Sequence, residues 1–261
     1  MRAWWQRLRP PRDVPETLWQ EVLQCYPFLA DRSPADVQRL RQLATHFLDQ
    51  KEFHGAQGLI ITDRMALSIA AQAVLPLLYL TQGDSIRKAL AWYDDFVGIV
   101  VHPDEVRARR EVQDDTGVVH HYEEILTGEA MEGGPVMLSW SDVAAADRTA
   151  AEGYNVVVHE FAHKLDMRDG LPDGCPPLPS SAGRRQWLQT LQSEYEQFRE
   201  QVIVAERFGG ATPWLDPYGA ENPGEFFAVA SEAYMVNPQT FRAQYNGLAA
   251  LLDTFYKPNR G

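Results

Sequence analysis

Residues 154–166 read Tyr154-Asn-Val-Val-Val-His159-Glu160-Phe-Ala-His163-Lys-Leu-Asp166, a helical stretch that contains the pattern His-Glu-X-X-His. A helix advances about 100° per residue, so side chains at positions i and i+4 lie on the same face, and both imidazoles can bind one ion. Glu160 lies beside that face and can take a proton from metal-bound water without binding the metal. The stretch therefore predicts a helix with two ligands and the general base of a catalytic zinc ion.

A catalytic zinc ion needs a third protein ligand and one open position for water. Asp169 stands at the distance of a compact pattern, but Asp166 replaces the glycine at which the chain must turn back to the metal. Glu225 lies in an otherwise apolar helical run, where a carboxylate is costly unless it is paired or binds a metal. We therefore predict Glu225 as the third ligand, with Glu232 or Asp166 accepting a histidine N–H. An ordinary surface or capping role for Glu232 stays open.

The rest of the chain alternates between helical and strand-like patterns. Apolar residues recur at helical spacing from Pro15 to about Gln82, with Ser33-Pro34 as a cap and first turn. Helical patterns return after Ala144, interrupted by loops rich in proline and glycine at 170–183 and 209–217. Between them lie three β-branched and aromatic runs, which predict strands at Phe96–His102, Gly117–Tyr122 and Pro135–Trp140. The expected fold class is α+β, with helices around a small mixed sheet.

Length and composition favour one domain. The chain has 261 residues, of which 45% are hydrophobic, and no internal repeat or long linker divides it. We expect a single domain over residues 1–261, with residues 1–15 as a loose N-terminal arm because three prolines fall within them. The two cysteines, Cys25 and Cys175, form no Cys-X-X-Cys pair, so neither a disulfide framework nor a thiolate metal site is predicted.

Charge and hydropathy exclude two classes of partner. A net charge of −12 argues against direct binding to nucleic acid, which needs concentrated lysine and arginine. The most apolar run, Met65–Leu80, is short for a bilayer span and contains Gln72 and Pro76, so a buried helix is expected there and no membrane partner. The first residues carry positive charge without an apolar core, so no secretory signal is predicted and a cytoplasmic location is expected.

Three further features of the sequence are the blocks Gly134-Pro-Val-Met-Leu-Ser-Trp140, His159-Glu-Phe-Ala-His163-Lys-Leu-Asp166 and Tyr218-Gly-Ala-Glu-Asn-Pro-Gly-Glu225-Phe-Phe-Ala228. In their order and spacing the chain resembles the Mlc titration factor A family of bacterial zinc peptidases, and the resemblance extends from about Phe53 to the C-terminus. The second and third blocks are also similar to the catalytic domain of anthrax lethal factor.

The resemblance implies a zincin-like metallopeptidase domain and a set of site residues. It implies Zn²⁺ on His159, His163 and Glu225, with Glu160 as the general base. It further implies that Tyr218 donates its hydroxyl to the oxyanion, a role that stabilises the transition state more than the ground state.

The same resemblance implies a substrate and a partner. The family is associated with aminopeptidase-like hydrolysis of peptides and with binding the glucose-responsive repressor Mlc, which links it to sugar uptake. An alternative stays open, in which the protein titrates a transcriptional repressor and its zinc is structural or switching. Glu160 favours catalysis, because a structural zinc site needs no base beside the ion.

Two further expectations concern the strands. Zinc peptidases of the resembling type place an edge strand before the active helix, so Pro135–Trp140 is expected to pair with an extended substrate, with an interior strand as the alternative. His102, His120 and His121 are additional candidates for metal or substrate contact, although histidines on a strand are more often structural.

Overall fold

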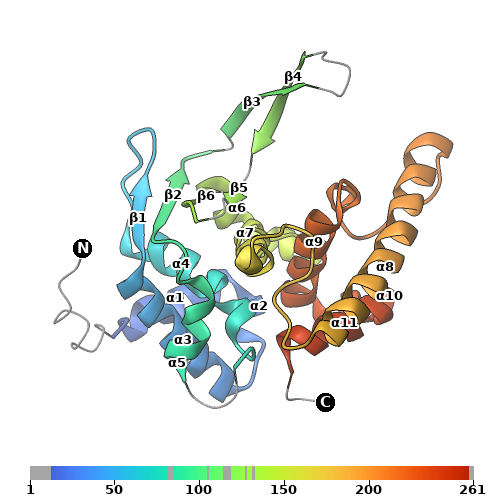
Figure 1. Ribbon diagram of the computed structural model, residues 1–261. Coiled ribbons are helices and arrows are strands. Elements are labelled where there is room, and N and C mark those ends of the chain that lie inside the picture. The colour runs from blue at the N-terminus through green and yellow to red at the C-terminus, as the bar shows by residue number, and fades with distance from the viewer. Residues whose placement is uncertain are drawn as a thin grey trace.

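The computed structural model describes residues 13–81, 85–104, 106–113, 119–126, 128–130 and 133–258. Helices dominate these residues, and the strands gather at one side of the molecule (Figure 1). The fold is therefore α+β, as the sequence predicts.

The elements follow one another in the order helices, strands, helices. The α-helices are α1 (Glu16–Cys25), α2 (Pro27–Ala30), α3 (Pro34–Gln50), α4 (Asp63–Ala73), α5 (Ile86–Leu90), α6 (Trp140–Thr149), α7 (Val156–Asp166), α8 (Ser181–Phe208), α9 (Pro223–Val236), α10 (Pro238–Gln244) and α11 (Asn246–Tyr256). The 3₁₀ turns are η2 (Leu75–Leu77), η3 (Ala91–Tyr93), η4 (Ala150–Glu152), η5 (Met167–Asp169) and η6 (Pro217–Ala220). The strands are β1 (Glu52–Gly55), β2 (Gly98–His102), β3 (Val106–Gln113), β4 (Val119–Leu126), β5 (Gly128–Ala130) and β6 (Val136–Ser139).

A mixed sheet with strand order β1-β2-β6-β5 lies next to α7. Strands β1, β2 and β6 run parallel, and β5 runs antiparallel to β6. The expectation that 135–140 forms an edge strand is wrong, because β6 lies between β2 and β5 and is largely buried. In the part of the chain that the structure describes, β5 takes that edge and contacts α7.

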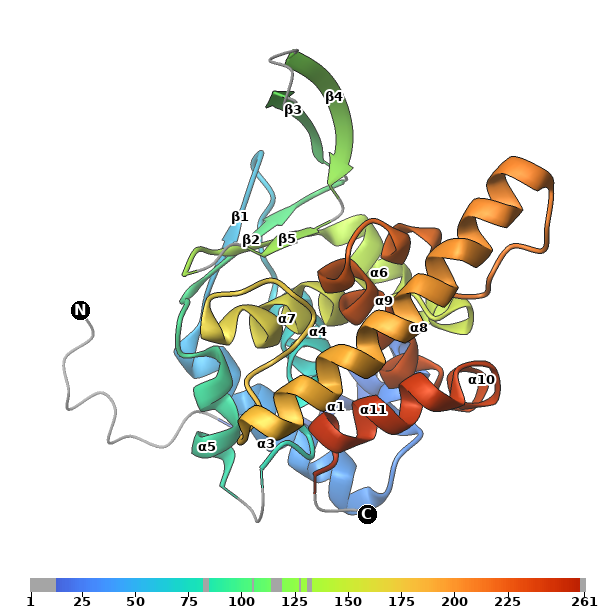
Figure 2. The same cartoon turned by 45° about the vertical axis from the view of Figure 1, so that its right-hand side comes forward.

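Strands β3 and β4 form a separate antiparallel ribbon that projects from the body of the molecule (Figures 1 and 2). The predicted strand at 117–122 overlaps β4, while residues 114–118 lie outside the described residues. Strand β3 was not predicted, because its sequence VRARREVQ is rich in charge and lacks the apolar run that indicates a strand.

Helix starts follow the local sequence. The Ser33 hydroxyl accepts a hydrogen bond from the Asp36 N–H at 3.2 Å, so the predicted cap of α3 is confirmed. Within the apolar run 65–80, α4 ends at Ala73 and Pro76 falls in η2, as proline disfavours a continuing helix. Among the described residues, no helix has the length and apolar character needed to cross a membrane.

The back of α7 is anchored in the core by one aromatic side chain. Phe161 is fully buried, and its ring centroid lies 5.6 Å from Phe47, 5.0 Å from Tyr93 and 5.8 Å from Phe96. Such clusters add specific ring contacts to the burial of apolar area. The contacts join α3 and the segment before β2 to the helix that carries the two histidines.

Candidate metal centre

Two helices distant in sequence bring the predicted ligands together. His159 and His163 lie one turn apart on α7, and their ring centroids are 4.7 Å apart. Glu225 lies in the first turn of α9, which packs against α7 (Figure 2). The Asn222 side chain caps α9 by accepting the Glu225 N–H at 3.0 Å, which fixes the backbone at the position of this carboxylate.

Three ligand atoms form an equilateral triangle. The Nε2 atoms of His159 and His163 are 3.1 Å apart, and each lies 3.1 Å from Oε2 of Glu225. Bonds of about 2.0 Å to a tetrahedral zinc ion place ligand atoms about 3.3 Å apart, so the triangle has the size of one face of that tetrahedron. The donor set therefore fits a divalent ion with one corner left for water, and the described residues contain no other such group of three.

Glu232 holds His159 from the side opposite the triangle. Its Oε1 lies 2.6 Å from Nδ1 of His159, and its Oε2 accepts the Asn155 N–H at 2.6 Å. Both oxygens of this buried carboxylate thus face N–H groups, and Nδ1 of His159 is the donor. The lone pair on Nε2 is then free to face a metal ion. Of the two predicted acceptors for a histidine N–H, the structure places Glu232 at the ring.

The charges around the triangle favour a cation. Burial opposes a charge on His159, but the carboxylates of Glu232 and Glu225 raise its pKa well above the usual value. Burial lowers the pKa of His163. Burial also opposes ionisation of Glu225, yet the two imidazoles hold its pKa far below the usual value. A bound metal ion would replace the proton of His159 as the positive charge that the Glu225 carboxylate faces.

Glu160 and Tyr218 flank the histidines. Glu160 is 4% exposed, and its negative charge adds to the field that raises the pKa of His159. The Tyr218 ring lies 6.1 Å from that of His159 and is 39% exposed, so it is open to a substrate. Asp216 orders the turn by accepting the Tyr218 N–H at 2.9 Å. The five residues predicted for the site are therefore neighbours in the structure.

The other carboxylates considered lie elsewhere. Asp169 is 3.4 Å from Arg184 and accepts the Leu171 N–H, away from the ligand triangle. Asp166 accepts the Gly174 N–H at 2.9 Å rather than a histidine N–H, and burial raises its pKa to about 7. The compact ligand pattern and the Asp166 acceptor therefore do not match the structure.

The additional histidines are spread over two strands. His102 ends β2 and pairs in register with Ser139. His120 and His121 lie on β4, and their side chains are outside the described part of the molecule. None of the three belongs to the ligand triangle found in the described residues.

Two polar residues near the site were not predicted. Asn155 caps α7 by accepting the Val158 N–H at 2.9 Å, and its type just before an apolar run was a usable signal for a helix start. The sequence gives no comparable signal for Gln72, because a single polar residue in an apolar helix can have many roles. The structure shows its side chain accepting a hydrogen bond from Asn155 at 2.7 Å.

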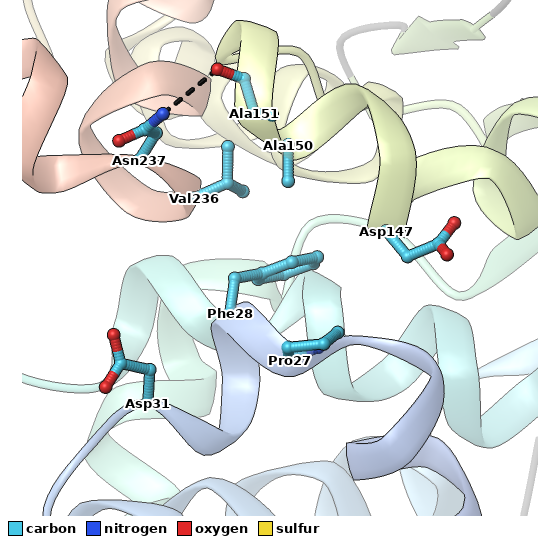
Figure 3. Close-up of a pocket in the computed structure, with 8 residues that line it drawn as sticks. All are labelled: Pro27, Phe28, Asp31, Asp147, Ala150, Ala151, Val236 and Asn237. Atoms are coloured by element: carbon cyan, nitrogen blue, oxygen red, sulfur yellow. Dashed lines mark hydrogen bonds between the residues drawn. The ribbon is translucent and has the colours of Figure 1, made fainter.

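A surface hollow of about 380 Å³ lies between α2, η4 and the end of α9 (Figure 3). Phe28 and Val236 supply apolar walls, and the Asn237 amide donates a hydrogen bond to the Ala151 carbonyl at 3.0 Å. Asp31 and Asp147 stand at its sides (Figure 3). None of the predicted site residues lines this hollow, so it is separate from the ligand triangle.

Comparisons with known proteins define the class. A family model described as glucose-regulated metallo-peptidase M90 matches residues 1–257. An uncharacterised protein of Synechocystis sp. is 33% identical over 253 residues, which are 96% of this chain and 85% of the relative. Mlc titration factor A of Yersinia pestis and of Yersinia pseudotuberculosis is 30% identical over 258 residues, 98% of this chain and 90% of the relative.

These matches and the His-Glu-X-X-His helix define a metallopeptidase. The chain belongs to the glucose-regulated metallo-peptidase family M90. Membership implies a divalent metal ion, and the triangle of His159, His163 and Glu225 is a group of side chains that could hold one. The family resemblance seen in the sequence is confirmed.

Proposed function

We propose that this protein is a zinc peptidase in which His159, His163 and Glu225 bind the ion and Glu160 is the general base. The observation that carries the proposal is the triangle of ligand atoms with edges of 3.1 Å. Two imidazoles and one carboxylate with an open fourth position are a typical ligand set of catalytic zinc. The bound ion would acidify a water molecule and polarise the peptide carbonyl.

The remaining chemistry falls to side chains of the chain itself. Glu160, a buried side chain next to His159, accepts the proton of the attacking water and delivers it to the leaving amine. Tyr218, beside His159 and exposed, donates its hydroxyl to the oxygen on which negative charge develops. His159 is held in the correct tautomer by Glu232.

The substrate in this proposal is an extended peptide. Strand β5, at the edge of the described sheet and in contact with α7, offers main-chain groups for pairing. Main-chain pairing binds peptides with little dependence on their side chains. We infer aminopeptidase-like hydrolysis from the resemblance in sequence, and a cytoplasmic location remains part of the proposal.

The test is Glu160→Gln in the full-length protein. We expect zinc content equal to the parent and a loss of peptide hydrolysis of at least about 10³-fold, because the variant cannot accept a proton. Metal analysis and a chelator-sensitive assay on a peptide library measure the two properties. Glu206→Gln, an exposed position on α8, is the matched control with parental activity. Hydrolysis by Glu160→Gln at the parental rate would refute the assignment of the base.

A second function is supported by the names of the relatives. Two of them are called Mlc titration factor A, so we also infer that this chain binds a transcriptional repressor of the Mlc type. Binding and hydrolysis separate in Glu160→Gln, which should still retain a purified repressor in a pull-down while it no longer cleaves peptides. Failure of both the parent and the variant to retain the repressor would remove this second function and leave the peptidase untouched.

A further inference from the structure

A buried chain of hydrogen bonds leads from the N-terminal helices to the candidate metal centre. Gln72 on α4 accepts a hydrogen bond from the Asn155 amide at 2.7 Å. The Asn155 backbone N–H donates to Glu232 at 2.6 Å, and Glu232 lies 2.6 Å from Nδ1 of His159. Gln72, Asn155 and Glu232 are at most 1% exposed. Hydrogen bonds are stronger in such a dry environment, and an unpaired member is costly.

Backbone groups at both ends fix the direction of the chain. Oδ1 of Asn155 accepts the Val158 N–H at 2.9 Å, so the Asn155 NH₂ group has to face Gln72. Gln72 therefore presents its oxygen to Asn155 and donates its own NH₂ group to the Ser68 carbonyl at 3.1 Å. Neither amide can be reversed without placing two donors or two acceptors against each other.

We propose that Gln72 is a positioning residue of the metal centre. Through Asn155 and Glu232 it holds the His159 ring so that Nε2 faces the ion, an inference that rests on the proposed ligand set. Gln72 itself reaches no ligand atom of the triangle. It links α4 to α7 and α9, the two helices that carry the ligands.

The first test is Gln72→Met, which keeps the length of the side chain and removes the oxygen that accepts from Asn155. We expect zinc affinity to fall about 3- to 10-fold, below the effect of removing a direct partner of a metal ligand. The measurement is competition for zinc between the full-length protein and a chelating dye. Zinc affinity equal to that of the parent within about twofold would overturn the proposal.

A second variant cuts the chain at another point. Asn155→Ser keeps a cap for the Val158 N–H but is too short to reach Gln72. It should lower zinc affinity as much as Gln72→Met. The double variant should bind zinc no more weakly than the single variant with the lower zinc affinity, because both substitutions break the same path. Additive losses would contradict a shared path. If Gln72→Met does not fold, the zinc affinities of Asn155→Ser and of the control variant described next decide the question.

The control is Tyr256→Phe, which removes another buried hydrogen bond, between Tyr256 on α11 and Ser231 on α9. The Tyr256 hydroxyl lies 2.8 Å from Oγ of Ser231, the residue next to Glu232, but outside the chain. This variant should unfold at a lower temperature than the parent and keep zinc affinity within about twofold. If Tyr256→Phe loses as much zinc affinity as Gln72→Met, the effect of Gln72→Met is general destabilisation and the proposed role of Gln72 is wrong. These tests measure zinc affinity and do not depend on peptide hydrolysis. A parent protein without peptidase activity would therefore refute the proposed hydrolysis but not the proposed role of Gln72.

Discussion

Tyr218 is the one side chain of the proposed site that is both beside a histidine and exposed. In Tyr218→Phe the ring remains and the hydroxyl is lost. We expect kcat to fall about 10²- to 10³-fold with zinc affinity unchanged, since the donor acts on charge that develops in the transition state. Steady-state kinetics with a peptide substrate measure it, and Tyr79→Phe, whose ring contacts Lys257, is the control. An effect confined to KM would indicate substrate binding instead.

Single residues differ in how well the sequence predicts their place. His159 and His163 share a face because four residues make about one helical turn, so their proximity follows from spacing alone. Glu225 was predicted from the cost of a carboxylate in an apolar run, and the structure brings it to both rings. Gln72 was not predictable, because its role depends on a contact with a residue 83 positions away.

At the scale of elements, a glycine sets the approach of the loop after α7 to the start of α9. Gly174 has φ +77°, and a Cβ there would lie 2.4 Å from the Pro223 carbonyl oxygen. Gly174→Ala should therefore displace the turn that carries Glu225 and lower both stability and zinc affinity.

Gly58→Ala separates this clash from backbone strain. Gly58 has φ +82°, but nothing lies within 4 Å of a Cβ at that position. We expect a cost of about 1 kcal/mol for this control and at least about 3 kcal/mol for Gly174→Ala, with zinc affinity lowered only in the latter. Urea unfolding and dye competition measure the two quantities. Equal effects of the two substitutions would show that the contact with Pro223 is unimportant.

Helices and strands were predictable to different degrees. Capping residues such as Ser33 announce a helix start because the signal is local. Strand β5 has three residues, too few for an alternating pattern, and β1 is a short polar segment within a helical region. The order of the sheet depends on pairing between distant segments, so the interior place of β6 could not be read from its own residues.

At the scale of the whole molecule, Asp166 makes stability depend on pH. Its Oδ1 is buried without a hydrogen-bond partner among the described residues, and burial raises its pKa to about 7, while an unfolded chain has about 3.9. At pH values between these two pKa values, Asp166 keeps its proton in the folded state and has released it in the unfolded state. Stability from this group is therefore complete below about pH 4 and is lost as pH rises to about 7.

Asp166→Asn removes this titration and keeps an oxygen for the Gly174 N–H. We expect the free energy of unfolding of the variant, relative to the parent, to increase between about pH 4.5 and 7.5 by an amount on the order of a few kcal/mol. Urea unfolding of both proteins over this range, at the same zinc concentration, measures the difference. A difference that does not change with pH would contradict the assignment.

In the proposed function, β5 would limit how long a product stays bound. An incoming strand would gain only a few main-chain hydrogen bonds from the three described residues of β5, so a cleaved fragment would dissociate readily after each cycle. Rapid turnover would thus have its origin in one brief stretch of backbone.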